Sequence, residues 1–326
     1  MENIEKKMLF SILVVLFFLS AFFVIAEGQE EESEDVFPSE PIHFVVPAGA
    51  GGGTDTHARL IAHKMEEYLS VPVIIENVSG GGTAVGSRKV IESEPDGYTI
   101  LLNIVNIFTN KALGNTEFDG FDFEPIAEVG AFYLCEVTGG DSEYTDFRQI
   151  MESIREEPGS VKIATRIGAI THFTSLGVQR EVGGEFHMVH IGDAATRITN
   201  ILGGHVDLGI FGTNEAVEYH HSGMMRILTV YSPERIVSLE DVPTAHELGL
   251  DYEQGVGFWI FAPPNTPENR IKILADTFEK VMNDPEIIEK LKSQTLVPTF
   301  KRGEEFITTL QKQSELIYSI AEEYDL

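Results

Sequence analysis

The residues at positions 49–53, Gly-Ala-Gly-Gly-Gly, carry almost no side chain and are followed by Thr54 and Asp55. The apolar run at 42–46 before them predicts a buried strand. Apolar residues at helical spacing after them predict a helix that Thr54 or Asp55 caps. Such a loop and first helical turn leave backbone N–H groups free at the positive end of the helix. The strand, glycine loop and helix therefore predict an anion site, where glycine lets a ligand approach the backbone closely.

The loop does not match the two common phosphate motifs. The dinucleotide fingerprint G-x-G-x-x-G/A is broken because Thr54 stands three residues after Gly51. The phosphate loop of nucleotide triphosphatases needs a lysine where this chain has Gly53. The spacing thus favours a small carboxylate or similar anion over a nucleotide. A flexible glycine turn without a ligand is the structural alternative.

Composition limits the classes of partner. The chain has 326 residues, enough for two domains, and 43% of them are hydrophobic, as in ordinary globular proteins. It holds 23 Lys and Arg against 52 Asp and Glu, a formal net charge of −29. Phosphate contacts need clustered cations, so nucleic acid is not expected as a partner. The single cysteine, Cys135, excludes an intramolecular disulfide and a multi-cysteine metal site, and its apolar neighbours indicate a buried thiol.

The N-terminus has the pattern of a targeting signal. Lys6 and Lys7 precede an apolar run at 8–26 that ends in small residues at the offsets signal peptidase prefers. We expect residues 1–26 to be a cleaved signal peptide; the run is also long enough to span a membrane, so an uncleaved anchor is the alternative. Residues 27–36 predict an acidic linker. Both alternatives place the rest of the chain in the periplasm or another extracytoplasmic space.

Strands and helices alternate after the glycine loop. A strand is expected at 71–76, a second glycine loop at 77–83, a helix at 86–94 and a strand at 98–102. Such alternation predicts a parallel sheet with helices on both faces and ligands at its carboxyl edge. Asn103 follows the third strand at that edge, where its amide could bond a ligand or cap a helix.

The remaining pattern predicts a second domain and a return to the first. Residues 126–129 are expected to cross into the second domain, and the apolar strand at 257–262, with the only tryptophan, to return from it. The predicted first domain is 37–127 plus 256–326, and the second is 128–255. Three C-terminal helices, each expected to pack on the first domain, follow at 268–283, 285–293 and 303–324. Thr266 is expected to cap the first of these helices.

The glycine loop is the first of several motifs that resemble one family. The TctC/Bug family, the extracytoplasmic solute-binding proteins of tripartite tricarboxylate transporters, opens with a motif that this chain resembles at Pro47-Ala48-Gly49-Ala50-Gly51-Gly52-Gly53-Thr54-Asp55, with Ala58-Arg59 behind it. The resemblance continues in order over nearly the whole chain after residue 37: at Val73-Ile74-Ile75-Glu76-Asn77, Gly80-Gly81-Gly82, Pro95-Asp96-Gly97-Tyr98-Thr99-Ile100-Leu101, Leu202-Gly203-Gly204-His205-Val206-Asp207, Asp241-Val242-Pro243-Thr244 and Gly257-Phe258-Trp259-Ile260-Phe261-Ala262-Pro263.

The resemblance implies a fold and a first half of the site. The fold is a two-domain, periplasmic-binding-protein-like (type II) α/β fold with the ligand in the cleft between the domains. Family members hold a carboxylate with backbone donors of the first-domain loops, partly through water. The matching positions are Ala50, Gly51, Gly52, Thr54 and Asp55. Asp55 is itself negative, so it should cap the helix or hold a water instead of touching the acid.

The second half of the site departs from the family pattern. The strand–loop–helix that begins at Thr165 matches it at Gly168, Thr171 and His172, but Arg166 stands where a glycine is usual. The planar guanidinium of arginine can donate two parallel hydrogen bonds to one carboxylate, so Arg166 is expected to bind the distal acid group of the ligand. The alternative is a surface arginine paired with an acidic residue of the protein. At 190–193 the chain lacks the usual cation and has Asp193. Thr213, in a loop at another carboxyl edge, completes the predicted ligand-binding set.

The implied function is capture of a small organic acid, a di- or tricarboxylate or similar anion, for handover to membrane permease subunits. No cofactor and no metal are expected, and we expect a monomer. An enzyme acting on a small acid is a rival, but no nucleophile elbow or H-E-x-x-H motif occurs. A second rival is a ligand sensor for a membrane kinase, whose binding domain would have the same sequence pattern.

Overall fold

The computed structural model describes residues 36–326, and the helices and strands of this described range lie in the compact unit Glu40–Leu326. The predicted signal peptide lies outside the described residues, as does the predicted linker except for Val36. Within the described range, no helix combines the length and apolar character needed to cross a membrane.

The first lobe begins with a parallel sheet. Its strands are β1 (Ile42–Val46), β2 (Val73–Asn77) and β3 (Thr99–Asn103), with β1 in the middle. Val45 of β1 pairs with Glu76 on one side and with Leu101 on the other, both in parallel register. The connecting helices are α2 (Gly53–Leu69), α3 (Ala84–Ile91) after a 3-10 turn η1 (Gly81–Thr83), and α4 (Asn106–Ala112), followed by the turn η2 (Gly120–Asp122). The predicted alternation is confirmed, and α4 is an element that the sequence pattern did not predict.

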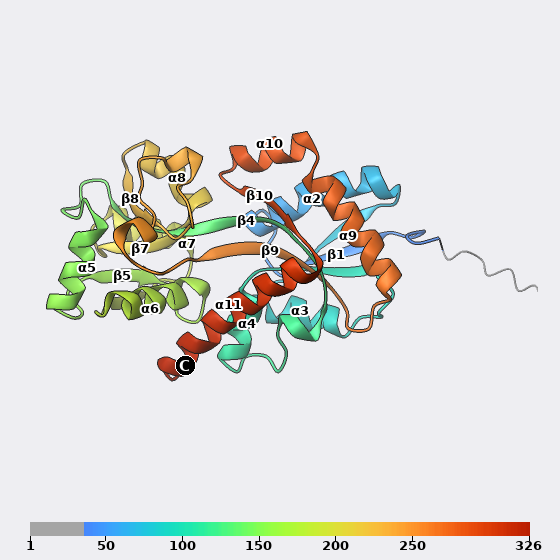
Figure 1. Cartoon of the computed structure of the whole chain (residues 1–326), viewed down its shortest axis with the longest axis horizontal. Coiled ribbons are helices and arrows are strands. Elements are labelled where there is room, and N and C mark those ends of the chain that lie inside the picture. The colour runs from blue at the N-terminus through green and yellow to red at the C-terminus, as the bar shows by residue number, and fades with distance from the viewer. Residues whose placement is uncertain (1–35) are drawn as a thin grey trace, which may run out of the picture. The chain divides into compact units, whose positions relative to one another are not determined.

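One long strand joins the two halves of the sheet. The strand β4 (Glu124–Gly139) pairs through its first part with β9 (Gly255–Ala262) and β10 (Val297–Lys301). Its second part pairs with β7 (Leu208–Gly212) and β8 (Met225–Val230). Residues 126–129, which were expected to cross into the second domain, lie inside this strand. Figure 1 shows β4 and β9 running side by side through the molecule.

The second lobe repeats the strand–helix pattern. Its parallel strands are β5 (Lys162–Thr165), β6 (His187–His190) and β7, with β5 in the middle. Its helices are α5 (Phe147–Glu156), α6 (Ile170–Val182), α7 (Ala194–Leu202) and α8 (Thr213–His221), and two 3-10 turns follow β8, η3 (Val237–Leu239) and η4 (His246–Leu248). We propose that the domain boundaries fall in β4 and β9, near residues 127 and 256.

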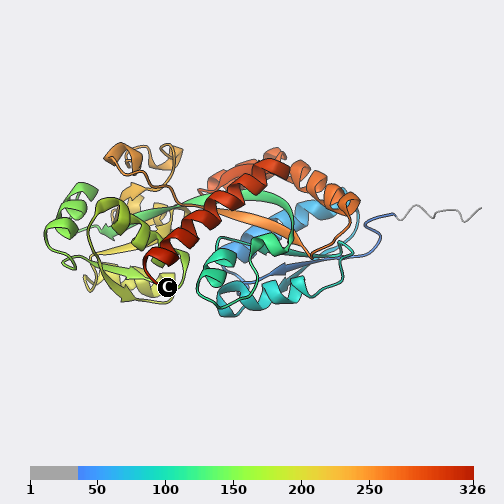
Figure 2. The ribbon, with the colours of Figure 1, turned by 60° about the horizontal axis from the view of Figure 1, so that its bottom comes forward.

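The C-terminal segment contacts both lobes. It comprises α9 (Glu268–Met282), α10 (Pro285–Ser293), β10 and α11 (Gly303–Glu323). The last helix, α11, packs on α4 of the first lobe and on β4, and it also reaches α6 of the second lobe (Figure 2). Arg180 of α6 donates a hydrogen bond to Ser319 Oγ at 3.2 Å, and Tyr324 donates to the carbonyl of Leu176 at 3.2 Å. Thr266 does not cap α9, because its hydroxyl donates to the carbonyl of Pro263 and Pro267 occupies the N-cap position.

Aromatic side chains fill the core under α11. Trp259 is fully buried and its ring lies 5.8 Å from that of Phe108 and 6.5 Å from that of Phe306. Burial of each such ring stabilises the fold by roughly 1.5–3 kcal/mol. The indole N–H of Trp259 donates to the buried Glu128 carboxylate at 3.0 Å, and Lys301 pairs with the same carboxylate at 3.0 Å. Cys135 is buried, as predicted.

Candidate functional site

The glycine loop ends at a helix whose N-terminus carries no side-chain cap. α2 begins at Gly53 and its N-cap residue is Gly52, so the prediction that Thr54 or Asp55 caps the helix was wrong. The N–H groups of the first turn have no carbonyl partner within an α-helix and remain available to an anion. The absence of a cap thus keeps the positive end of α2 open.

Asp55 holds the glycine loop from inside. Its carboxylate, only 2% exposed, accepts hydrogen bonds from the N–H of Gly51 at 2.7 Å, from Asn77 Nδ2 at 2.8 Å and from Arg59 Nε at 2.9 Å. Burial by itself would raise the pKa of this carboxyl, but the hydrogen bonds from Arg59, Gly51 and Asn77 outweigh it and lower the pKa to about 2. Asp55 therefore stays charged, and the charge of Arg59 is already compensated.

The second glycine loop and Asn103 complete the wall of the first lobe. Gly80, Gly81 and Gly82 all have positive φ angles, which side-chain-bearing residues rarely adopt. Asn110 Nδ2 donates to the carbonyl of Gly82 at 2.7 Å and fixes this loop. Asn103 is 1% exposed; its Nδ2 donates to Ser87 Oγ at 2.8 Å and its Oδ1 accepts from the following N–H. Its amide is thus bonded inside the protein.

Both loops face the second lobe across a hollow of about 350 Å³. The first lobe contributes Pro47, Ala48, Gly49, Thr54, Ser79, Gly80, Gly81, Gly82, Thr83, Asn103, Ile104 and Asn106, and the second contributes Arg166. A guanidinium therefore stands opposite the free end of α2. This arrangement fits an anionic group, because backbone N–H donors and a cation surround the same space.

The loop that carries Arg166 is braced by the helix that follows it. The N–H of Arg166 donates to Thr171 Oγ1 at 3.1 Å, and Thr165 Oγ1 donates to the same oxygen at 3.1 Å. The N–H of Gly168, where φ is +82°, donates to His172 Nδ1 at 3.4 Å. Burial lowers the pKa of His172, so its ring is neutral and can accept this bond. These contacts give Thr171 and His172 a positioning role, while the Arg166 guanidinium has neither hydrogen bond nor ion pair within residues 36–326.

A second hollow, of about 340 Å³, adjoins the first and contains a cation that the sequence analysis missed. Thr54, Ile104, Asn106 and Arg166 line both hollows. The second is also lined by Gly53, Phe132, Leu134, Ala169, Ile170, Thr171, Gly192, Asp193, Ala194, Arg197, Phe211, Gly212, Asn214, Glu215 and Phe258. Arg197 lies inside α7, where nothing in the sequence separates a buried arginine from a solvated one. The only available signal was its position four residues after Asp193.

Asp193 and Thr213 have local structural roles in the second lobe. Asp193 is the N-cap of α7, and its two carboxylate oxygens accept from the N–H and the hydroxyl of Thr196, both at 2.8 Å. These bonds lower the pKa of Asp193. Thr213 begins α8, is fully buried, and its hydroxyl has no partner in the described part of the chain. The neighbouring Asn214 lines the second hollow, and its Oδ1 is also unpartnered there.

The structure brings only some of the predicted site residues to the cleft. A third hollow of about 330 Å³, on the other side of Arg166, contains Gly168 and the amides of Asn106, Asn110 and Asn115. The predicted residues that line one of the three hollows are Thr54, Asn103, Arg166, Gly168, Thr171 and Asp193. Those that line none of them are Ala50, Gly51, Gly52, Asp55, His172 and Thr213. Direct contact of any of these residues with a ligand stays a prediction.

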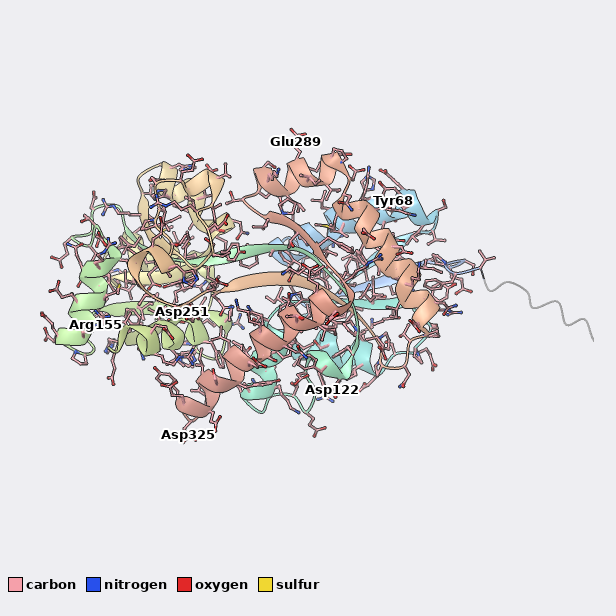
Figure 3. All side chains as sticks on the ribbon, in the orientation of Figure 1. Tyr68, Asp122, Arg155, Asp251, Glu289 and Asp325 are labelled. Carbon is pink, nitrogen blue, oxygen red and sulfur yellow. The ribbon has the colours of Figure 1, made fainter. Side chains whose placement is uncertain are left out.

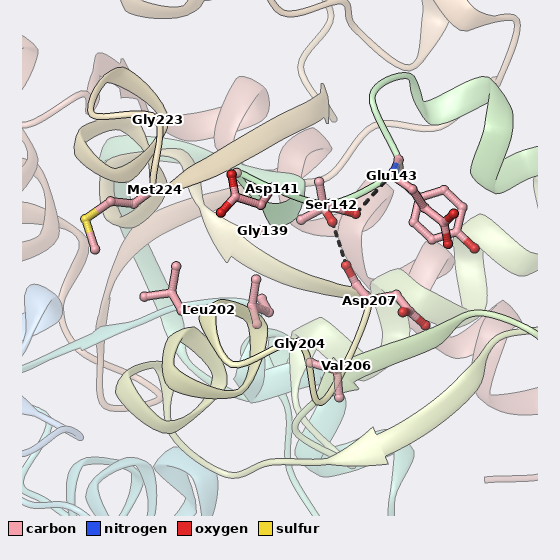
Figure 4. A pocket seen from close by; sticks show the side chains of 14 residues that line it. Gly139, Asp141, Ser142, Glu143, Leu202, Gly204, Val206, Asp207, Gly223 and Met224 are labelled. Atoms are coloured by element: carbon pink, nitrogen blue, oxygen red, sulfur yellow. Dashed lines mark hydrogen bonds between the residues drawn. The ribbon is translucent and has the colours of Figure 1, made fainter.

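A larger hollow, of about 580 Å³, lies at the opposite end of β7 and has different chemistry. Asp141, Glu143 and Asp207 contribute carboxylates to it, and the exposed side chains of Leu202 and Met224 stand at its wall (Figure 4). A carboxylate ligand would be repelled there. In the described residues no group of three or more His, Cys, Asp or Glu side chains is arranged to hold a metal ion. The anion-binding chemistry therefore points to the cleft around Arg166.

The acidic residues of the chain are spread over its outside. Asp122, Asp251, Glu289 and Asp325 are exposed on different elements (Figure 3). With a net charge of −29, the general field of the protein repels small anions. Local donors and cations must overcome this repulsion at the site.

Comparison with known proteins decides the family. A family model described as "Tripartite tricarboxylate transporter family receptor" (TctC) matches residues 57–326. The chain belongs to this family. The TctC resemblance seen in the sequence is thereby confirmed, and with it a role as a solute-binding receptor.

Two curated relatives of this TctC-family chain illustrate the similarity. A UPF0065 protein of Agrobacterium vitis is 29% identical over 271 residues, which cover 82% of this chain and 78% of that protein. Protein BugT of Bordetella pertussis is 27% identical over 274 residues, covering 82% of this chain and 83% of that protein.

Solved structures confirm the fold class. A TctC solute-binding protein from Polaromonas without ligand has a TM-score of 0.78 at 24% identity, covering 88% of this chain and 99% of that one. MatC from Rhodopseudomonas palustris with bound malate has a TM-score of 0.75 at 22% identity, covering 87% of this chain and 100% of that one. An R. palustris protein with adipate has a TM-score of 0.74 at 24% identity, covering 88% of this chain and 96% of that one. The two-domain binding-protein fold predicted from the sequence is therefore correct.

Proposed function

We propose that this TctC-family receptor binds a small organic acid in the cleft between its lobes and delivers it to membrane permease subunits. The observation that carries the proposal is the position of Arg166, which lines one hollow with the uncapped N-terminus of α2. Backbone N–H groups would hold one carboxylate, and the guanidinium would hold an acid group from the other side. The malate and adipate bound by two structural neighbours support a carboxylate ligand.

The side chains at the cleft favour binding over catalysis. The ionisable groups that line the hollows are Arg166, Arg197, Asp193 and Glu215. The Asp193 carboxylate already accepts the hydrogen bonds that cap α7. Among these lining residues, no serine, cysteine or lysine nucleophile lies beside a base. We propose that the chain is a monomeric, extracytoplasmic receptor without enzymatic activity.

A ligand screen tests the proposal. The chain from residue 27 onward is screened by thermal shift against mono-, di- and tricarboxylates, and each hit is measured by titration calorimetry. A ligand at ~100 times its dissociation constant should add roughly 2.7 kcal/mol of stability. If no organic acid binds, the proposal is wrong.

A substitution at Arg166 tests the location of the site. Arg166→Gln should weaken a hit roughly 10- to 100-fold, since hydrogen bonds to a charged group contribute about 1.5–3 kcal/mol. Arg148→Gln, at an exposed arginine on α5, is the matched control and should change nothing. Unchanged affinity in Arg166→Gln would remove the ligand from this cleft. Uptake of the labelled acid by proteoliposomes that contain the permease, only when the receptor is added, tests delivery.

A further inference from the structure

We propose that Arg197 and Arg166 together form a second anion subsite, which selects unbranched dicarboxylates over monocarboxylates. The inference rests on the proposed function, because it assigns the distal half of the same cleft. The first carboxylate would lie at the end of α2, and the second between the two guanidinium groups. Thr54 lines both hollows, so the two subsites lie next to each other.

Arg197 is a buried cation with an unused donor. Its side chain is 7% exposed, and its guanidinium carbon lies 5.2 Å from the centre of the Phe211 ring, in a cation–π contact. Its Nη1 donates only a long bond, 3.5 Å, to the carbonyl of Gly192. Its Nε has no partner in the described residues. A buried donor without a partner lowers the stability of the protein. An acceptor on a ligand in the hollow that Arg197 lines would remove this loss.

The acids near Arg197 do not pair with it. Asp193 and Glu215 lie close enough to favour its charged form, but neither forms an ion pair with it. Asp193 is bonded to Thr196, and Glu215 Oε2 accepts from the N–H of Gly212 at 3.4 Å. Burial, and the like charge of Arg166, lower the pKa of Arg197. Both arginines line the second hollow and neither forms an ion pair with a described residue, so a ligand carboxylate there would accept hydrogen bonds from both and relieve their repulsion.

Part of the lining of the second hollow is apolar. Phe132, Leu134, Ile170, Phe211 and Phe258 line the second hollow together with the two arginines. The rings of Phe132 and Phe258 lie 5.7 Å apart. These side chains can contact a methylene chain, and Asn106 and Asn214 add polar groups to the same hollow. The chemistry therefore matches an aliphatic diacid with its carboxylates at the two ends.

Calorimetry with matched acids tests the inference. Unbranched diacids of four to eight carbons and the monoacids of equal length are titrated into the wild type, Arg197→Gln, Arg197→Lys and the control Arg148→Gln. The wild type and the control should bind the best diacid at least 10-fold more tightly than its monoacid. In Arg197→Gln the diacid should weaken about 10-fold or more and the monoacid less than threefold, so the preference collapses. Arg197→Lys should keep part of the preference, because it keeps the charge without the fork.

The outcomes separate the subsite from the receptor function. If acids bind but the wild type shows no preference for diacids, or Arg197→Gln keeps the preference, the inference fails and the proposed function stands. If no acid binds the wild type, both fail. The melting temperature of each ligand-free variant detects a merely structural role: a fall of several degrees in Arg197→Gln, with the preference unchanged, would overturn the subsite.

Discussion

Arg59 beside the glycine loop is bonded to Asp55 and Asn77, whereas Arg166 and Arg197 in the other wall face the cleft without an ion pair. The first wall thus presents neutral backbone donors held by an internal charge network. The second wall presents cations that form no ion pair with a described residue. The two lobes share the strand–loop–helix pattern but use charge differently.

This difference suggests a division of labour. In the proposed site, backbone N–H groups at the end of α2 would bind any carboxylate, and a side-chain substitution cannot remove them without disturbing the loop. Side chains of the second lobe differ in charge and reach, so they can set which acid is bound. We expect changes in the first wall to weaken all acids alike, and changes in the second wall to alter the preference among them.

Asp55→Ala should produce the largest effect on binding. It removes one buried acceptor from three donors, so we expect a loss of roughly 3 kcal/mol in the free energy of unfolding and the loss of binding for every acid. Urea unfolding and calorimetry measure the two effects. Asp251→Ala, at a fully solvated aspartate, is the control. Wild-type affinity in Asp55→Ala would show that the first wall does not depend on this network.

Glu136→Gln should change the pH dependence of stability in the second lobe. Glu136 is fully buried on β4 and accepts from Tyr231 at 2.6 Å, and burial raises its pKa to about 8. Glu136 holds its proton more tightly in the native state than in the unfolded chain, where its pKa is about 4.5. The stabilisation that this proton provides is therefore full below about pH 4.5 and is lost as pH rises towards 8.

The variant should therefore be more stable than wild type at pH 8.5, by on the order of 5 kcal/mol, and similar to it near pH 4.5. Melting curves from pH 4.5 to 8.5 check this. Parallel curves would show that Glu136 is ionised in the native state. The stability that Asp55 provides depends on pH in the opposite direction, because its pKa is lowered in the native state. Its contribution to the free energy of unfolding is full above about pH 4 and is lost as pH falls towards 2.

Arg59→Gln should have a small effect, in contrast to Arg166→Gln. The Arg59 side chain is 53% exposed and pairs with Asp55, so we expect a cost of about 0.5–1 kcal/mol in stability and an affinity within threefold of wild type. Thermal unfolding and the same titrations measure both. A tenfold loss of affinity would mean that Arg59 leaves Asp55 to contact the ligand, and that both walls use free cations.

Thr213→Val should have the smallest effect. The buried hydroxyl of Thr213 has no partner, so its removal should stabilise the protein by up to about 1 kcal/mol and change affinity less than twofold. Chemical unfolding and calorimetry test the two expectations. A tenfold weaker complex would instead return Thr213 to the ligand site, as the sequence pattern predicted.

Local sequence signals predicted most of the fold. The apolar strands, the helix at 285–293 and the return strand at 257–262 were found close to their places, because their signals are short-range. The short strand β10 was missed because its five residues are all only partly buried and it forms by pairing with β4 far away in the chain. The helix α4 was missed since its seven residues follow Asn103 without a clear start signal.

Long-range contacts decided the roles of the site residues. The pattern at 165–172 identified the Arg166 loop, but only packing showed that His172 and Thr171 brace it from within. Asp55 looked like a helix cap because its type and position fit one. Asn77 and Arg59 instead hold it under the loop.

The sequence by itself determined the family, the two-domain α/β fold and the glycine loop before α2, because these depend on backbone conformation and on motifs that are local in the chain. Only the tertiary structure decided which charges are free. A guanidinium is available to a ligand when no acid reaches it, and this depends on residues brought together from distant elements. Arg59 and Arg197 have similar sequence surroundings, each four residues after an aspartate, yet the first is paired with its aspartate and the second is not.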